Sequence, residues 1–294
     1  MSVLDIATLA VGARVQHELM VRNREDKVTK NGDPFAVLHL GNASGQISAN
    51  MWKEQLPYLE GVKSGSVVQV IGTVESYQGR RQLKITAPLR VIAATAVNLD
   101  EFLPRVSVDT AQLWETVDKW RSELKSAKLR MAVDLFFADD DFRSKFERAP
   151  GATRGHHAQI GGLLRHVIEV GSIARASART MGGDVDVVTA GALLHDIGKV
   201  ESYSISASGF DLTHGGALLQ HVALGSLMLD RRLRSLPAGI FTEAQEFELQ
   251  HLIQSVEQGA PVRPMTFEAE LLYWADQTSA NANNFERDST ESWI

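Results

Sequence analysis

The hydrophobic period of this 294-residue sequence changes partway along the chain, and that change determines its fold class. Between about residues 12 and 92, short runs of alternating apolar and polar residues are separated by turn residues, as around Val68 and Val70. Beyond that region, apolar residues recur every three or four positions, as at Leu113 and Val117. A period of two is typical of strands with one buried face, and a period near 3.6 is typical of amphipathic helices. We therefore expect a β domain followed by an all-α domain.

Turn residues and strand patterning indicate a small barrel in the first part. Asn31-Gly32 is a strong signal for a hairpin turn, and Gln82, Lys84 and Thr86 occupy alternate positions of another strand. A short helical insert is expected near residues 52–61. Four or five such strands predict a Greek-key barrel of the OB type over residues 1–95, a fold on which single-stranded nucleic acid commonly lies.

The second part is predicted to be a helical bundle over residues 126–294. A linker and connecting helix over residues 96–125 precede it, with Pro104 interrupting regular structure and Asp109 or Thr110 capping the helix. Together the two parts make a multidomain α and β protein. Apolar periodicity predicts further helices near residues 127–138, 140–148, 159–181, 185–197, 215–234, 243–257 and 266–283.

Composition excludes some functional classes. The chain has no cysteine, which rules out disulfides and thiolate metal sites, so the cytoplasm is the expected compartment. No apolar run is long enough to span a membrane, and the start lacks the features of a secretory signal. The net charge is −6, yet residues 1–100 hold 11 Lys and Arg against 9 Asp and Glu. This surplus of basic residues in the β domain is a weak indication of polyanion binding.

The segment AGALLHDIGKV, residues 190–200, places an ionisable pair at the end of an apolar helix. Burying His195 and Asp196 would cost several kcal/mol unless something compensates. A divalent cation would compensate, particularly with His166 from one apolar helix and Asp276 from another. Two histidines and two aspartates leave coordination positions open, and such an ion can present hydroxide to phosphorus. Gly198 is expected to let the chain turn sharply past these ligands.

The spacing of these residues resembles a known family. His166, then 28 residues, then His195-Asp196 followed by IGK, and later Asp276, is similar to the signature of HD-domain phosphohydrolases. HHAQIGGLLRHVIEV (156–170), NGDPFAVLHLGNASGQISANMW (31–52) and LTHGGALLQHVALG (212–225) resemble segments of one branch, the YhaM-type 3′→5′ exoribonucleases. Members of that branch join an OB-fold domain to an HD domain, in the order that this sequence predicts.

The resemblance implies roles for particular residues. His166, His195, Asp196 and Asp276 would be metal ligands, and His221 would stand where two-metal members place a further histidine. Asp196 could also orient the attacking water. Lys199 and His221 would stabilise negative charge on the phosphate, so the catalytic candidates are Asp196, Lys199 and His221.

The cofactor implied is a divalent metal ion, and one ion is expected rather than two. Sites made of histidine and aspartate accept Mn²⁺, Mg²⁺, Co²⁺, Fe²⁺ or Ni²⁺, so the sequence leaves the metal open. Where the branch carries a histidine pair, this chain has Val256 and Glu257. Glu257 could substitute as an oxygen ligand, but a solvated glutamate on a helix face is the favoured interpretation.

Other positions also depart from the family pattern. Arg165 replaces a glutamate, and His214 stands where an acidic residue is expected. His251 lies five residues from Val256, about 140° around an ideal helix, and cannot take over the role of a missing histidine. Either His156 or His157 is a candidate for contacting the substrate or supporting a ligand.

For nucleic-acid binding, the β domain offers aromatic and basic residues, which single strands require for stacking and for charge neutralisation. Tyr77 lies in a polar hairpin tip, whereas Phe35, in an alternating strand, is expected to be core. The candidate set is Tyr77, Arg80, Arg81, Lys84, Lys30 and Trp52.

Three functions follow from these observations. The leading hypothesis is a metal-dependent phosphodiesterase that degrades single-stranded RNA or DNA from the 3′ end and releases nucleoside monophosphates. The second is an HD-type phosphohydrolase of free nucleotides, and the third is a single-strand-binding protein with a decayed HD site. No membrane partner is expected, and a homo-oligomer is compatible with the sequence.

Overall fold

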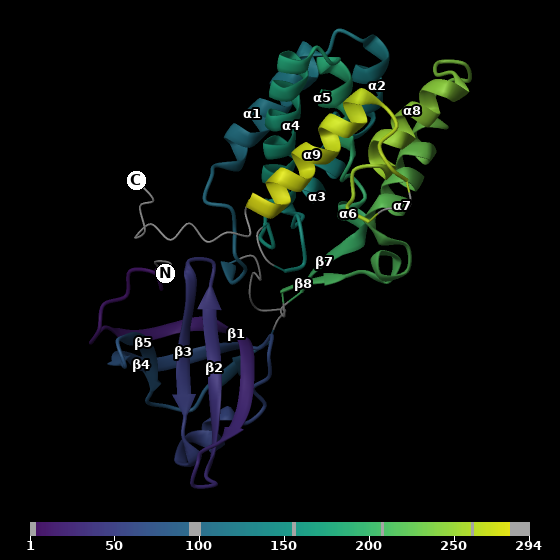
Figure 1. Ribbon diagram of the computed structural model, residues 1–294. Coiled ribbons are helices and arrows are strands. Elements are labelled where there is room, and N and C mark those ends of the chain that lie inside the picture. Colours follow the sequence, from purple (N-terminus) through teal and green to yellow (C-terminus); the bar gives the residue numbers. More distant parts are fainter. Residues whose placement is uncertain (1–3, 94–100, 155–156, 207–208, 260–261, 283–294) are drawn as a thin grey trace. The chain divides into compact units, whose positions relative to one another are not determined.

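The computed structural model describes residues 4–93, 101–154, 157–206, 209–259 and 262–282 (Figure 1). The chain divides into two compact units. One consists of Met1–Arg105 with Ile205–Gly209, and the other of Val106–Ser204 with Phe210–Ile294. Each has its own hydrophobic core, so each is described separately.

The N-terminal unit contains a β-barrel. Its sheet runs in the order β1-β2-β3-β5-β4-β6, and β1 also pairs with β4, which closes the barrel. All pairs are antiparallel except β3 with β5, which are parallel with Ser48 opposite Gln82. The elements are β1 (Arg14–Val28), β2 (Pro34–Asn42), β3 (Gly45–Met51), the 3₁₀ helix η1 (Lys53–Leu59), β4 (Val67–Tyr77), β5 (Arg80–Ile85) and β6 (Arg90–Ile92).

Local signals in the sequence account for these strands. Gly32 adopts a positive φ of 89° in the turn that joins β1 to β2, as the Asn31-Gly32 pair predicts. Along β4 and β5, buried residues such as Val68, Val70 and Leu83 alternate with more exposed ones and fill the barrel interior. The predicted OB-type barrel is confirmed.

The second unit is a helical bundle, also as predicted. The most buried helix is α5 (Val185–Leu194), which contacts α2, α4, α8 and α9. No helix among the described residues has the length and apolar character needed to cross a membrane. The other helices are α1 (Thr110–Glu123), α2 (Ala127–Phe137), α3 (Asp140–Arg148), α4 (Gly162–Met181), α6 (Lys199–Ser202), α7 (His214–Leu233), α8 (Glu243–Gln254) and α9 (Phe267–Ala282).

One element between α6 and α7 was not predicted. β7 (Tyr203–Ser206) and β8 (Gly209–Leu212) pair in a two-stranded sheet inside a region expected to be entirely helical. Each strand has four residues, and the burial of β7 does not alternate. A strand this short and uniform in burial carries no two-residue hydrophobic period that the sequence could reveal.

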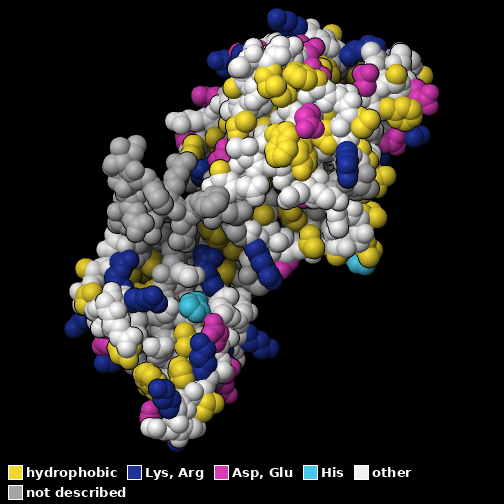
Figure 2. All heavy atoms as spheres, in the orientation of Figure 1, with side chains coloured by type: hydrophobic (Ala, Val, Ile, Leu, Met, Phe, Trp, Pro, Cys, Tyr) yellow, Lys and Arg dark blue, Asp and Glu magenta, His cyan; other side chains and the backbone are white. Residues whose placement is uncertain are grey.

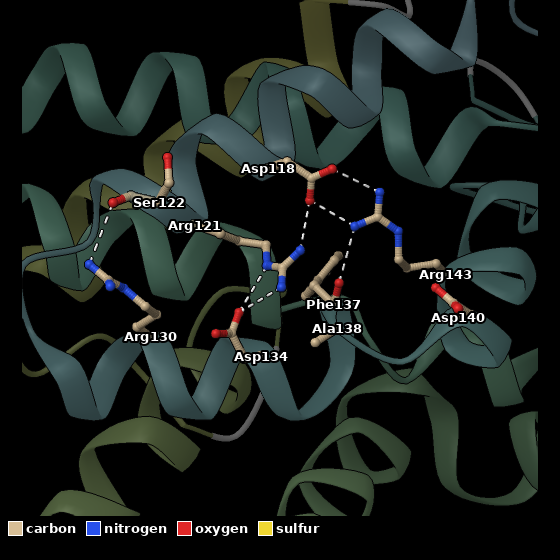
Figure 3. Close-up of a pocket in the computed structure, with 9 residues that line it drawn as sticks. All are labelled: Asp118, Arg121, Ser122, Arg130, Asp134, Phe137, Ala138, Asp140 and Arg143. Atoms are coloured by element: carbon tan, nitrogen blue, oxygen red, sulfur yellow. Dashed lines mark hydrogen bonds and ion pairs between the residues drawn. The ribbon is translucent and has the colours of Figure 1, made fainter.

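An ion-pair network joins α1, α2 and α3 around a surface hollow of about 520 Å³ (Figure 3). Asp118 accepts hydrogen bonds from Arg121 at 2.7 Å and from Arg143 at 2.7 and 2.9 Å. Arg121 also donates to Asp134, and Arg130 donates to backbone carbonyl oxygens. All three arginines that line the hollow therefore form hydrogen bonds within the protein. The network links the helices to one another and does not present an open anion-binding site.

Candidate metal centre

The pair His195-Asp196 is buried at the end of α5. Asp184 caps the start of this helix, because its carboxylate accepts hydrogen bonds from the backbone N–H groups of Asp186 and Val187. Its last turn is closed by the N–H of His195, which donates to Gly191 at 2.8 Å. His195 is 3% exposed and Asp196 is 2% exposed, so the apolar surroundings do bury this ionisable pair.

Four side chains from three parts of the bundle converge at this point. His166 comes from α4 and Asp276 from α9. Asp196 Oδ2 lies 3.3 Å from Nε2 of both His166 and His195. Asp276 Oδ1 lies 2.9 Å from His166 Nε2 and 3.8 Å from His195 Nε2. The donor atoms of His166, His195 and Asp196 all lie within 4.8 Å of one another, a spacing that fits a shared ion.

The bonding state of these atoms supports the same interpretation. In the part of the chain that the structure describes, His166 Nε2, His195 Nε2 and Asp196 Oδ2 are buried without a partner in hydrogen-bonding geometry. Their close neighbours are other ionisable groups of the same cluster, such as Asp276 beside His166 and Lys199 beside Asp196, whereas buried polar atoms normally form well-aligned hydrogen bonds. Imidazole nitrogens and a carboxylate oxygen are ordinary ligands of divalent metals. The residues present therefore fit a divalent ion.

The electrostatics of these side chains point the same way. Burial lowers the pKa of His166, but the carboxylates of Asp196 and Asp276 outweigh burial and raise it to about 9. Burial raises the pKa of Asp196, but Lys199 and His195 have the larger effect and hold it well below its usual value. A proton on His166 thus supplies positive charge that a metal ion would replace, because metal binding requires neutral imidazole.

Gly198 does not have the role expected from the sequence. Its φ of −67° and ψ of −17° are helical values that any residue can adopt, so no special turn is needed there. A Cβ atom at this position would lie 1.9 Å from the backbone oxygen of His221 and 2.4 Å from the backbone nitrogen of Gly225. Glycine is required because α7 passes directly over this backbone.

That close approach places His221 beside the centre. α7 is kinked at Gln220, whose φ of 62° and ψ of 166° are unfavourable for a residue other than glycine. The next residue, His221, has its Nε2 3.5 Å from Asp196 Oδ1. The structure therefore brings His221 to the opposite oxygen of the carboxylate that contacts His166 and His195.

An open pocket of about 300 Å³ leads to these residues. Lys199 lies in its wall with its Nζ 2.6 Å from Asp196 Oδ2. Burial lowers the pKa of Lys199, but Asp196 more than offsets this and raises it above the usual value, so the amine is charged. His166, His221 and Asp276 also line the pocket. Its volume is at the lower end of the roughly 300–1,000 Å³ range of small-ligand sites.

Comparison with known proteins agrees with this architecture. The HD domain model matches residues 163–281, and the OB-fold nucleic acid binding domain model matches residues 18–88. The 3′-5′ exoribonuclease YhaM of Bacillus subtilis is 30% identical over 282 residues, covering 94% of this chain and 88% of that protein. The chain belongs to the YhaM family. A relative of the same name from Bacillus pumilus is 28% identical over 287 residues, covering 96% of this chain and 90% of that protein. The family resemblance inferred from the sequence is confirmed.

Within this YhaM-family chain, the two departures at positions 256 and 257 have different outcomes. Val256 is 2% exposed and packs in an apolar cluster with Leu252 and Ala269, so it offers the centre nothing. Glu257 does reach the centre, because its Oε2 lies 3.2 Å from His221 Nε2. Its side chain is 44% exposed, so Glu257 is both solvated, as favoured from the sequence, and in contact with His221. His251 lies elsewhere, accepting a hydrogen bond from the backbone N–H of Met265.

The nucleic-acid candidates of the barrel lie at two ends of the β3–β5 pair. The parallel register places Arg80 and Arg81 near the start of β3, with Tyr77 across the hairpin. Trp52 follows the end of β3 and is 50% exposed. Its ring stacks on Phe35 at 5.3 Å, so Phe35 is a half-buried stacking partner rather than a core residue. Lys30, in the β1–β2 turn, and Lys84 are exposed.

The charges of this barrel surface are mixed. Figure 2 shows Lys and Arg side chains on the visible face of the N-terminal unit with Asp and Glu among them. Lys84 pairs with Glu75 at 3.0 Å, and Arg81 donates to the backbone oxygen of Leu9 at 2.6 Å. Tyr77 is 58% exposed. The candidates are therefore accessible, and those already paired would have to exchange a partner to bind phosphate.

Two residues beside the centre were missed by sequence reasoning. Ser279 Oγ lies 3.1 Å from His166 Nδ1 and donates to Glu169 at 2.9 Å. Glu169 lies three residues after His166 on α4, and Ser279 lies three residues after Asp276 on α9. That spacing places each on the same helix face as a predicted ligand, which is the signal that could have identified them.

Proposed function

We propose that this protein is a metal-dependent 3′–5′ exoribonuclease that releases nucleoside monophosphates. The observation that carries the proposal is the convergence of His166 Nε2, His195 Nε2 and Asp196 Oδ2, which are buried and lie within 4.8 Å of one another. The named activity of the YhaM relatives and the match to an OB-fold nucleic acid binding domain support the choice of RNA.

In this proposal, His166, His195, Asp196 and Asp276 hold one divalent ion. The ion supplies Lewis-acid chemistry, lowering the pKa of water and polarising a phosphoryl oxygen. The buried Val256 favours one ion over two, because it cannot act as a ligand. Asp196 has a second oxygen, Oδ1, that faces His221 and can accept a hydrogen bond from the attacking water.

Charged residues of the pocket stabilise the negative charge that grows on the phosphate. Lys199 carries a positive charge within the pocket wall. His221 also lines the pocket, and Glu257 Oε2 lies 3.2 Å from its Nε2. Fixed charges at a buried site stabilise a transition state more strongly than the same charges in water. Trp52 and Tyr77 of the barrel would supply stacking surfaces for bases remote from the scissile bond.

The test is a time course with 5′-labelled single-stranded RNA and single-stranded DNA, with and without Mn²⁺, beside the Asp196→Ala variant. We expect a Mn²⁺-dependent ladder that shortens RNA from the 3′ end and is absent in the variant. Intact strands under every condition would refute the proposal. Hydrolysis of free nucleotides in parallel reactions would then identify a nucleotide phosphohydrolase, and strand binding without any turnover would identify a decayed site.

A further inference from the structure

A polar network lies on the side of His166 that faces away from Asp196 and Asp276. His166 Nδ1 is 3.1 Å from Ser279 Oγ, and Ser279 Oγ donates to Glu169 Oε2 at 2.9 Å. His166 and Ser279 are both 3% exposed. The network connects α4 to α9, the two helices that also supply His166 and Asp276.

The proton positions in this network follow from the chemistry of its groups. A serine hydroxyl has one proton to donate, and an ionised carboxylate can only accept. Because Ser279 gives its proton to Glu169, its oxygen can only accept from His166. His166 must therefore carry a proton on Nδ1. In the neutral imidazole, this leaves the lone pair on Nε2, the atom that lies 2.9 Å from Asp276.

The surroundings keep Glu169 ionised, as this argument requires. Arg165 donates to Glu169 Oε1 at 2.9 Å, and His157 Nε2 lies 3.3 Å from Oε2. Burial raises the pKa of Glu169, but the hydrogen bonds from His157, Ser279 and Arg165 outweigh burial and lower it below the usual value. Arg165, to which the sequence assigned no role, and His157, a candidate for contacting the substrate or supporting a ligand, both act on this carboxylate.

The other histidine of the centre is held differently. His195 Nδ1 lies 2.9 Å from the backbone oxygen of Ala192, one turn earlier in the chain. A backbone carbonyl can only accept, so His195 also carries its proton on Nδ1. No side-chain substitution removes that carbonyl. The orientation of His166, in contrast, depends on two side chains that substitution can remove.

We propose that Ser279 and Glu169 are positioning residues that fix His166 with its proton on Nδ1 and thereby set the affinity of the centre for a divalent ion. The proposal rests on the proposed function in one respect, namely that the centre binds such an ion. Outer partners of metal-bound histidines typically contribute about 10–100-fold to metal affinity or activity.

The experiment measures Mn²⁺ affinity of the full chain by the electron paramagnetic resonance signal of free Mn²⁺. Ser279→Ala and Glu169→Ala should each bind Mn²⁺ about 10–100-fold more weakly than the unsubstituted protein. Their double variant should be no more than about twofold weaker than the worse single variant, because both residues act through one imidazole. The control Thr278→Ala removes the neighbouring exposed hydroxyl, which donates to the backbone oxygen of Trp274 within α9, and should leave the affinity unchanged.

Rescue separates positioning from a general loss of folding. Ser279→Thr retains a hydroxyl and should recover most of the affinity lost in Ser279→Ala. Thermal unfolding of the chelated variants checks that each one is folded. Single variants with unaltered affinity, or a double variant whose two losses multiply, would overturn the proposal while leaving the proposed function intact. An unsubstituted protein that binds no Mn²⁺ would overturn both.

Discussion

Replacing Gly198 with alanine tests how closely α7 packs over the metal centre. The new Cβ would lie 1.9 Å from His221 O and 2.4 Å from Gly225 N, and both are backbone atoms that cannot rotate away. The backbone of Gly198 is helical, so alanine introduces no φ strain and the effect is purely steric. Overpacking costs about 1–3 kcal/mol. Because backbone blocks two directions here, we expect about 3 kcal/mol of destabilisation.

The matched control is Gly215→Ala in the first turn of α7. A Cβ at Gly215 would meet its nearest neighbours at 3.9 Å, which is ordinary contact, and alanine favours helix over glycine by roughly 0.5–1 kcal/mol. Calorimetry should show Gly198→Ala melting roughly 6–12 °C lower, at about 2–4 °C per kcal/mol for a unit of this size. Gly215→Ala should melt at or slightly above the original temperature. Equal melting temperatures for the two variants would refute the steric reasoning.

Three further predictions concern other parts of the protein. Equilibrium dialysis with Mn²⁺ should give one bound ion per chain, and a stoichiometry of two would contradict the single-ion centre. Hydrogen bonds from Arg143 lower the pKa of Asp118 in the folded protein. The ionised Asp118 therefore stabilises the fold at pH values above its pKa in the unfolded chain, roughly 3.9, and this contribution is lost as the pH falls through the folded pKa. The melting-temperature difference between the original protein and Asp118→Asn should therefore shrink below about pH 4, and a constant difference would count against the ion pair. Trp52→Ala should weaken single-strand binding about fivefold or more, since stacking contributes roughly 1–3 kcal/mol per base. The control Val91→Ala, at an exposed position of β6, should leave binding unchanged. Equal fluorescence-anisotropy binding curves for the two variants would exclude Trp52 from the interface.

The secondary structure was predictable where its cause is local. Asp109 caps α1 by accepting from the N–H of Ala111, and Leu113 and Trp120 lie on its buried face, as the helical period indicates. The Asn31-Gly32 turn is equally local. These features depend on residues only a few positions apart, so one sequence contains all the information needed to place them.

Contacts between distant residues were not predictable in this way. The requirement for glycine at position 198 comes from His221 and Gly225, which the fold brings against it. The stacking of Phe35 on Trp52 likewise depends on the pairing of β2 with β3. In both cases the residue could be singled out from the sequence, but its predicted role was wrong. Gly198 was expected to form a sharp turn and Phe35 to be core, whereas their actual partners are set by tertiary structure.

The candidate site likewise contains residues that the sequence could predict and residues that it could not. The spacing of His166, His195 and Asp196 indicated a shared metal centre, and the fold brings their donor atoms together. Ser279 lies 113 residues from His166 and forms no recognisable motif with it. The sequence signal for this hydrogen bond is the three-residue spacing of Ser279 from Asp276 on α9. Many unrelated serines lie at such a spacing from an aspartate, so the signal is weak.

The packing explains how Val256 and Glu257 are accommodated beside the candidate metal centre. His166 lies on α4, His195 directly follows α5, and Asp276 lies within α9. These three helices pack closely against one another. Val256 follows α8 and belongs to the same apolar cluster, so a valine there fills core volume and leaves the spacing of the first ligands intact. Glu257 keeps an acidic oxygen beside His221. Both residues are therefore accommodated without disturbing the helices that carry His166, His195 and Asp276.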